Sequence, residues 1–192
     1  MDDLMQEVAA CAARLVVEEG LEYGAAKRRA LKTLGLPSRT ALPSNELLEQ
    51  AVLEYIEIFC ADTQPQELAA LRAHALEWMQ RLEEFRPHLG GAVWRGTATR
   101  LSDIYLQLFC DDPKSAEIAL INMNYSYDVT SVNGFQGGAV DALSVHSFCQ
   151  ALREDVGVHL LIYDLDDLRG ALLPDDQGRR MRGDAKAVKS LL

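Results

Sequence analysis

The chain has 192 residues, of which 48% are hydrophobic and 25% are charged, and its formal net charge at pH 7 is −10. This size allows one sizeable core, or a small helical unit beside a mixed domain. The negative charge makes nucleic acid an unlikely partner, because a phosphate backbone would be repelled. The apolar runs are too short for a membrane span and the Met-Asp-Asp start lacks a secretory signal, so we expect a cytoplasmic protein with no membrane contact.

The first half of the chain has the spacing of apolar residues that is typical of helices. Two helices are expected at residues 4–19 and 21–34, ended by Gly20 and by Gly35 with Pro37. Ser44 and Asn45 supply a cap for a third helix that reaches about residue 60. A fourth helix runs from about residue 63 toward Pro87. Residues 1–88 are therefore predicted to form a helical region.

After Gly90 the pattern changes to short apolar or alternating runs bounded by turn residues. Strands are expected at residues 92–95, 104–110, 117–122, 140–146 and 158–163, with a turn between Val129 and Ala139. Residues 147–154 are expected to form a short helix, and residues 184–191 a final one. The fold class is therefore α+β, with the helical N-terminal region packed on a mixed β-sheet domain at residues 89–192.

Within the expected strand at 104–110, apolar and polar residues alternate. Ile104, Leu106 and Leu108 should be buried, and they should alternate with Tyr105 and Gln107.

Two basic clusters stand out against the acidic composition. Lys27, Arg28, Arg29 and Lys32 lie on an expected helix, and Arg179, Arg180 and Arg182 lie in an expected loop. Each cluster fits either a solvated surface or a contact with a phosphate or a partner.

A turn at Gly91 and Ala92 is followed about ten residues later by Asp103-Ile104-Tyr105-Leu106. This arrangement resembles the nucleotidyltransferase superfamily that includes DNA polymerase beta and the small bacterial MNT-type proteins. In that superfamily a Gly-Ser or Gly-Gly turn precedes Asp-hydrophobic-Asp-hydrophobic by about ten residues. Two residues depart from the pattern, since Ala92 replaces the turn serine and Tyr105 replaces the second aspartate.

The resemblance implies a degenerate active site in a nucleotidyltransferase-like domain. Asp103 would be the first catalytic and metal-binding carboxylate. Asp141, in Val140-Asp141-Ala142-Leu143, is the best match for the carboxylate that the family carries on a later strand. The residues implied to line a nucleotide or phosphate pocket are Gly91, Ala92, Arg95, Arg100, Ser102 and Tyr105.

The replacement at Tyr105 bears on the chemistry. Two carboxylates one residue apart on a strand point to the same face, where they can hold Mg²⁺ ions that bridge nucleotide phosphates. A phenol that titrates near pH ~10 offers no such charge. Mg²⁺ is therefore expected to be weakly held or absent, and catalysis is doubtful although binding of a nucleotide or another phosphorylated ligand can survive.

A second hypothesis comes from a different class of function. The chain can be a non-enzymatic interaction or regulatory protein that uses its helical region to bind a partner. The glycine turn can also be only a helix stop, and Asp141 can be a residue at the edge of a turn.

Overall fold

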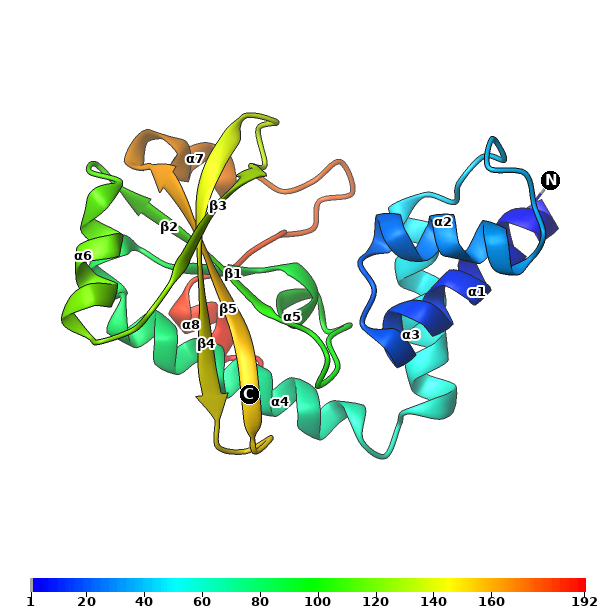
Figure 1. Ribbon diagram of the computed structural model, residues 1–192, viewed down its shortest axis with the longest axis horizontal. Helices are drawn as coiled ribbons and strands as arrows, with labels where there is room; N and C mark the ends of the chain where they lie inside the picture. Colours follow the sequence, from blue (N-terminus) through cyan, green and yellow to red (C-terminus); the bar gives the residue numbers. More distant parts are fainter. Residues whose placement is uncertain (1) are drawn as a thin grey trace. The chain divides into compact units, whose positions relative to one another are not determined.

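The structure is a computed structural model that describes residues 2–192, and it contains two compact units (Figure 1). The first unit comprises the residues up to Gln66 together with Thr97–Leu101, and the second comprises Glu67–Gly96 together with Ser102–Leu192. This division differs from the expected boundary after residue 88, because most of the fourth helix belongs to the unit that contains the sheet. No helix within residues 2–192 is long and apolar enough to cross a membrane.

The first unit consists of helices. They are α1 (Asp2–Glu19), α2 (Tyr23–Thr33) and α3 (Asn45–Phe59), in agreement with the sequence prediction. Ser44 caps α3 by accepting a hydrogen bond from the backbone N–H of Leu47 at 3.1 Å. Lys27 Nζ, almost fully buried, donates to Asn45 Oδ1 at 2.7 Å and so connects α2 to α3. The unit's own core includes Val8, Ala12, Leu15, Ala26, Ala30, Leu31, Leu48 and Val52.

The second unit is built on a five-stranded sheet in the order β1-β2-β5-β4-β3. The strands are β1 (His88–Gly90), β2 (Ile104–Cys110), β3 (Asp128–Asn133), β4 (Ala139–Cys149) and β5 (Glu154–Asp164). Only β2 and β5 pair in parallel, so the sheet is mixed, and the α+β prediction is confirmed. The helices of this unit are α4 (Gln64–Arg81), which starts in the first unit, α5 (Gly91–Arg95), α6 (Lys114–Asn122), α7 (Leu168–Ala171) and α8 (Ala185–Lys189).

The two faces of the sheet differ in what covers them. On β2, Ile104, Leu106 and Leu108 are buried whereas Tyr105 and Gln107 are half-buried, so the predicted alternation is confirmed. α4 runs along the buried face (Figure 1). The other face carries Tyr105, and its part around that residue is called the open face below.

α4 is held to the sheet by a buried polar contact. The indole N–H of Trp78 donates to Ser147 Oγ at 2.9 Å, and His74 Nε2 lies 2.8 Å from the same oxygen. Since Ser147 Oγ accepts from Trp78, its own hydrogen is available to a neutral His74. This contact explains why α4 belongs with the sheet.

Two segments expected as strands are helical. Residues 91–95 form the single turn of α5, and residues 117–122 belong to α6. In α6 the buried residues Ala116 and Leu120 are four apart, so the apolar run Ile118 to Ile121 follows a helical period and not a period of two. A short run of this kind does not distinguish the two by itself.

Two further expectations are corrected around the β3–β4 and β4–β5 connections. Residues 147–154 form the end of β4, a turn and the start of β5 instead of a helix. The sequence does not predict β3, because its residues show no apolar alternation. In the structure five of its six residues are exposed. The edge position of β3 in the sheet explains this pattern.

The buried histidines predict a dependence of stability on pH. Burial lowers the pKa of His74 and of His88 below their usual 6.5, so both stay neutral in the folded chain at a pH where the unfolded chain binds protons. We expect the free energy of unfolding to be highest above pH ~6.5 and to fall as the pH falls from there through the lowered values.

Urea unfolding at pH 7.5, 6.5 and 5.5, followed by tryptophan fluorescence, measures this slope. His88→Asn should reduce the slope relative to the unsubstituted chain. A flat profile across this range would contradict the role of the buried histidines.

Candidate functional site

The open face holds a row of polar and aromatic side chains that runs across three strands. Tyr105 on β2 is paired with His159 on β5, and His159 is paired with Ser144 on β4. Residues in register on neighbouring strands point to the same face, so the three side chains lie side by side. Asp103, two residues before Tyr105, continues this face just ahead of β2.

A chain of hydrogen bonds connects this row. Ser144 Oγ lies 2.8 Å from His159 Nδ1, and His159 Nε2 lies 2.8 Å from Asp103 Oδ2. Both ring nitrogens of His159 are therefore engaged, which fixes the orientation of the imidazole. The side chains of His159 and Asp103 remain 23% and 45% exposed, so the pair is accessible from solvent.

Tyr105 is packed between the glycine turn and His159. Its ring stacks on the imidazole with the centroids 4.8 Å apart and an angle of 28° between the planes. Gly91 lies on the other side of the Tyr105 ring, and a Cβ added at Gly91 would be 3.5 Å from Tyr105 Cδ2. The structure thus brings Gly91, Tyr105, His159 and Asp103 together on the open face.

The position of Asp103 depends on the absence of a side chain at Gly157. A Cβ at Gly157, which precedes His159 by two residues on the same face of β5, would stand 2.7 Å from both Cγ and Oδ1 of Asp103. Such a distance is a clash, and so only glycine lets the carboxylate lie over β5 beside the imidazole.

The glycine turn is itself held in place from α4. Arg72 donates from Nε to the carbonyl of Val93 at 2.9 Å and from Nη2 to that of Trp94 at 3.0 Å. These carbonyls lie at the end of α5, where a cation also interacts favourably with the helix dipole. Gly96 ends the turn with φ of +91°. The backbone that carries Gly91 is therefore fixed before any ligand arrives.

The other four residues implied by the resemblance are divided between the two units. Ala92 and Arg95 are half-buried residues of α5, and Ser102 directly precedes Asp103. Arg100 is exposed and belongs to Thr97–Leu101 in the first unit.

Asp141 does not join the site. It lies on β4 opposite Ile162, three residues from Ser144, so strand alternation turns its side chain to the other face of the sheet. The expected metal pair of Asp103 and Asp141 is therefore not formed. The strand beside β2 is β5, and its residue opposite Tyr105 is His159, not a carboxylate.

The remaining donors do not fit a two-metal centre. Asp103 is the single carboxylate at the row, Tyr105 contributes a neutral phenol, and no cluster of three or more His, Cys, Asp or Glu side chains suited to a metal occurs within residues 2–192. Two-metal transfer needs carboxylates that bridge both ions, and Asp103 alone does not supply them.

The Ser144–His159–Asp103 chain has the residue types of a nucleophilic triad, but its surroundings do not suit acyl transfer. Ser144 lies in the middle of β4, which is paired on both sides with β3 and β5. Backbone N–H groups in such a strand are used in the ladder and are not available as an oxyanion hole. The geometry is that of an ordered polar surface that presents a histidine and a carboxylate.

Comparison of the chain with models of known protein families, with curated proteins and with solved structures gives no significant match.

The contact between Gly157 and Asp103 can be tested by adding one methyl group. Gly157→Ala should displace the Asp103 carboxylate, break its bond to His159 Nε2 and lower stability by about 1–3 kcal/mol, as overpacking does. The imidazole ¹⁵N resonances of His159 report the lost bond directly.

Gly138→Ala is the matched control, because nothing lies within 4 Å of a Cβ added there. Unchanged His159 resonances in Gly157→Ala would show that Asp103 does not hold the ring.

Proposed function

We propose that the second unit is a nucleotidyltransferase-like module that binds a nucleotide or another phosphorylated ligand at the open face, with little or no transfer activity. The observation that carries the proposal is the contact of the Gly91 turn with Tyr105 on the strand that Asp103 opens. The resemblance needs Asp103 beside the Gly91 turn, and the contact of that turn with Tyr105, two residues after Asp103, supports this placement.

Three properties of the open face support binding of such a ligand. The aromatic rings of Tyr105 and His159 form one stacked group to which a planar base can add. The Ser144–His159–Asp103 chain supplies fixed hydrogen-bonding groups for hydroxyl groups of a sugar. Gln107 Oε1, on the same face, is a buried acceptor without a hydrogen-bond partner among the described residues.

The same residues argue against efficient transfer. Losing one metal-binding carboxylate removes several kcal/mol of charge stabilisation from a transition state, and every ~1.4 kcal/mol is a tenfold loss of rate. The residue of β5 opposite Tyr105 is His159, so β5 provides no carboxylate at this position. We therefore expect binding to be detectable where incorporation of labelled nucleotide into RNA or protein is not.

Exchange of Tyr105 provides the test. Tyr105→Asp would place a second carboxylate on the face of Asp103, and we expect Mg²⁺ to improve binding of a nucleoside triphosphate at least tenfold, about 1.4 kcal/mol, in calorimetric titrations. Because Tyr105 is half-buried between Gly91 and His159, the exchange should also lower stability by about 1–3 kcal/mol.

Tyr105→Asn is the control, since it removes the same ring without adding charge. A lower melting temperature in both variants, with no dependence of binding on Mg²⁺ in Tyr105→Asp, would contradict the proposed site. Robust transfer by the unsubstituted chain, abolished by Asp103→Ala, would contradict the expected lack of catalysis.

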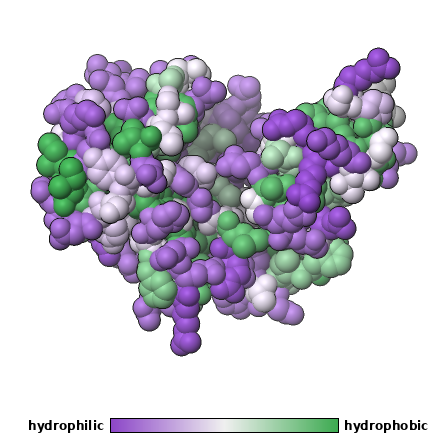
Figure 2. All heavy atoms as spheres, viewed as in Figure 1, coloured by the Kyte–Doolittle hydropathy of each residue, from purple (hydrophilic) through white to green (hydrophobic). Residues whose placement is uncertain are grey.

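A second candidate function is partner binding through the helical unit. At the end of α3, Ile58 and Phe59 are 71% and 68% exposed, although both are large apolar side chains. Apolar residues also reach the surface at separate places among the charged ones (Figure 2). An exposed aromatic beside an exposed aliphatic residue is typical of a contact anchor for another protein.

Photo-crosslinking from position 58 distinguishes this second candidate function from the first. A discrete crosslinked protein, lost in Phe59→Ser while nucleotide binding at the open face is unchanged, would favour partner binding.

A further inference from the structure

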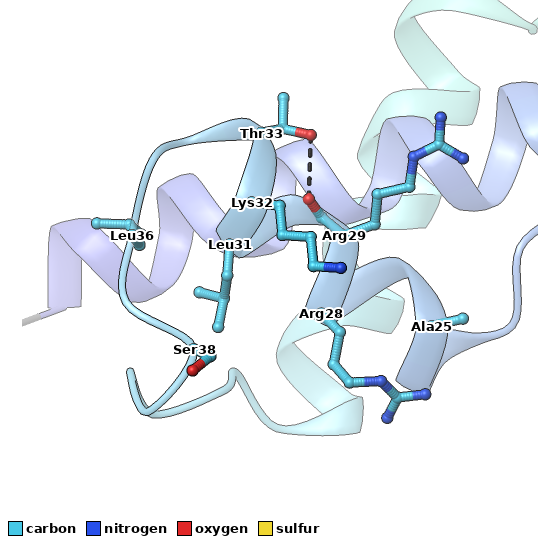
Figure 3. A pocket seen from close by; sticks show the side chains of 8 residues that line it. All are labelled: Ala25, Arg28, Arg29, Leu31, Lys32, Thr33, Leu36 and Ser38. Atoms are coloured by element: carbon cyan, nitrogen blue, oxygen red, sulfur yellow. Dashed lines mark hydrogen bonds between the residues drawn. The ribbon is translucent and has the colours of Figure 1, made fainter.

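A cavity of the first unit lies beside α2 and has a volume of about 680 Å³ (Figure 3). It is called the α2 pocket here. Its walls come from α2 and from the loop that follows it, so it belongs entirely to the helical unit and shares no residue with the open face. The lining residues are Ala25, Arg28, Arg29, Leu31, Lys32, Thr33, Leu36 and Ser38.

The loop wall is fixed by the way α2 ends. Leu36 N–H donates to the carbonyl of Leu31 at 2.8 Å, and Gly35 N–H donates to that of Lys32 at 3.1 Å. Gly35 has φ of +68°, so these bonds form the glycine-ended helix stop known as a Schellman motif. The motif turns the chain back beside α2, and the pocket is preformed.

The cations of the pocket are not equivalent. Arg29 is neutralised by an ion pair with Glu19 at 2.7 Å. Arg28 and Lys32, one helical turn apart, form no ion pair with any residue in the described part of the chain. In Figure 3 their side chains extend from the same stretch of α2, and Leu31 and Leu36 supply the apolar wall.

Two cations without an ion-pair partner beside an apolar wall favour binding of an anionic ligand that has an apolar or planar part. A guanidinium can hold two oxygens of one phosphate, and the ammonium of Lys32 can meet a third as a point charge. A long polyanion fits the site poorly, since the chain as a whole carries a net charge of −10.

We propose that the α2 pocket binds a small phosphate-bearing molecule. Its phosphate lies between Arg28 and Lys32, and its apolar or planar part packs on Leu36, which is half-buried. A volume of this size is within the range of pockets for small ligands, which is roughly 300–1,000 Å³.

Amide resonances of ¹⁵N-labelled full-length chain, titrated with inorganic phosphate, adenosine, AMP and a single-stranded RNA of ~20 nucleotides, test the proposal. We expect saturable shifts of Gly35, Leu36 and Ser38 with AMP, weaker binding of phosphate and none of adenosine. Arg28→Gln and Lys32→Gln should each weaken AMP binding at these resonances at least fivefold.

The control variants are Lys186→Gln and Lys189→Gln, which make the same change of net charge on α8 in the other unit. Equal weakening in all four variants would overturn the proposal, because general charge would then explain the binding. Tighter binding of the RNA than of AMP, or adenosine binding as tightly as AMP, would overturn it as well. Shifts confined to the open face with AMP would reject the α2 pocket while leaving the nucleotide site there intact.

Discussion

The register of β5 is the constraint on which the candidate site depends. β5 pairs in parallel with β2 on one side and antiparallel with β4 on the other, so it sets which residues of those strands stand beside His159. A shift by one residue would turn every side chain of a strand to the opposite face and separate Tyr105 and Ser144 from the imidazole. The buried residues of the same strands, among them Leu106 and Leu160, hold this register because they must face the core. Packing on one face thus fixes polar geometry on the other.

The sequence predicts most of this framework where a long or strict period is present. The three helices of the first unit and the alternation along β2 follow from spacing alone. It does not predict α6, whose short apolar run suits either period, or β3, whose edge position leaves it polar. Among the expected site residues, Gly91 contacts Tyr105, and Asp103 lies two residues before Tyr105. Their role in binding a ligand stays a prediction. No spacing in the sequence indicates that His159 and Ser144 meet, because their contact is made across strands. The prediction for Asp141 is wrong, because the face it occupies depends on a strand register that the sequence does not show.

The two basic clusters of the sequence have different roles in the structure. Arg179 forms an ion pair with Asp175 at 3.0 Å, and the guanidinium of Arg182 lies 4.9 Å from the centre of the Phe135 ring and donates to the carbonyl of Ala171. The contacts of Arg182 connect the C-terminal segment to the open-face side of the sheet, where Phe135 packs on Tyr163. Arg28 and Lys32 make no comparable contact, so their charges are available for the phosphate-bearing ligand proposed for the α2 pocket.

We propose that the open face, and not another surface, binds the nucleotide. The most direct measurement follows the imidazole ¹⁵N resonances of His159 while a nucleoside triphosphate is added, because both ring nitrogens take part in the Ser144–His159–Asp103 chain. We expect a saturable shift of these resonances with the same dissociation constant that calorimetry gives. Saturable binding by calorimetry with the His159 resonances unmoved would contradict it.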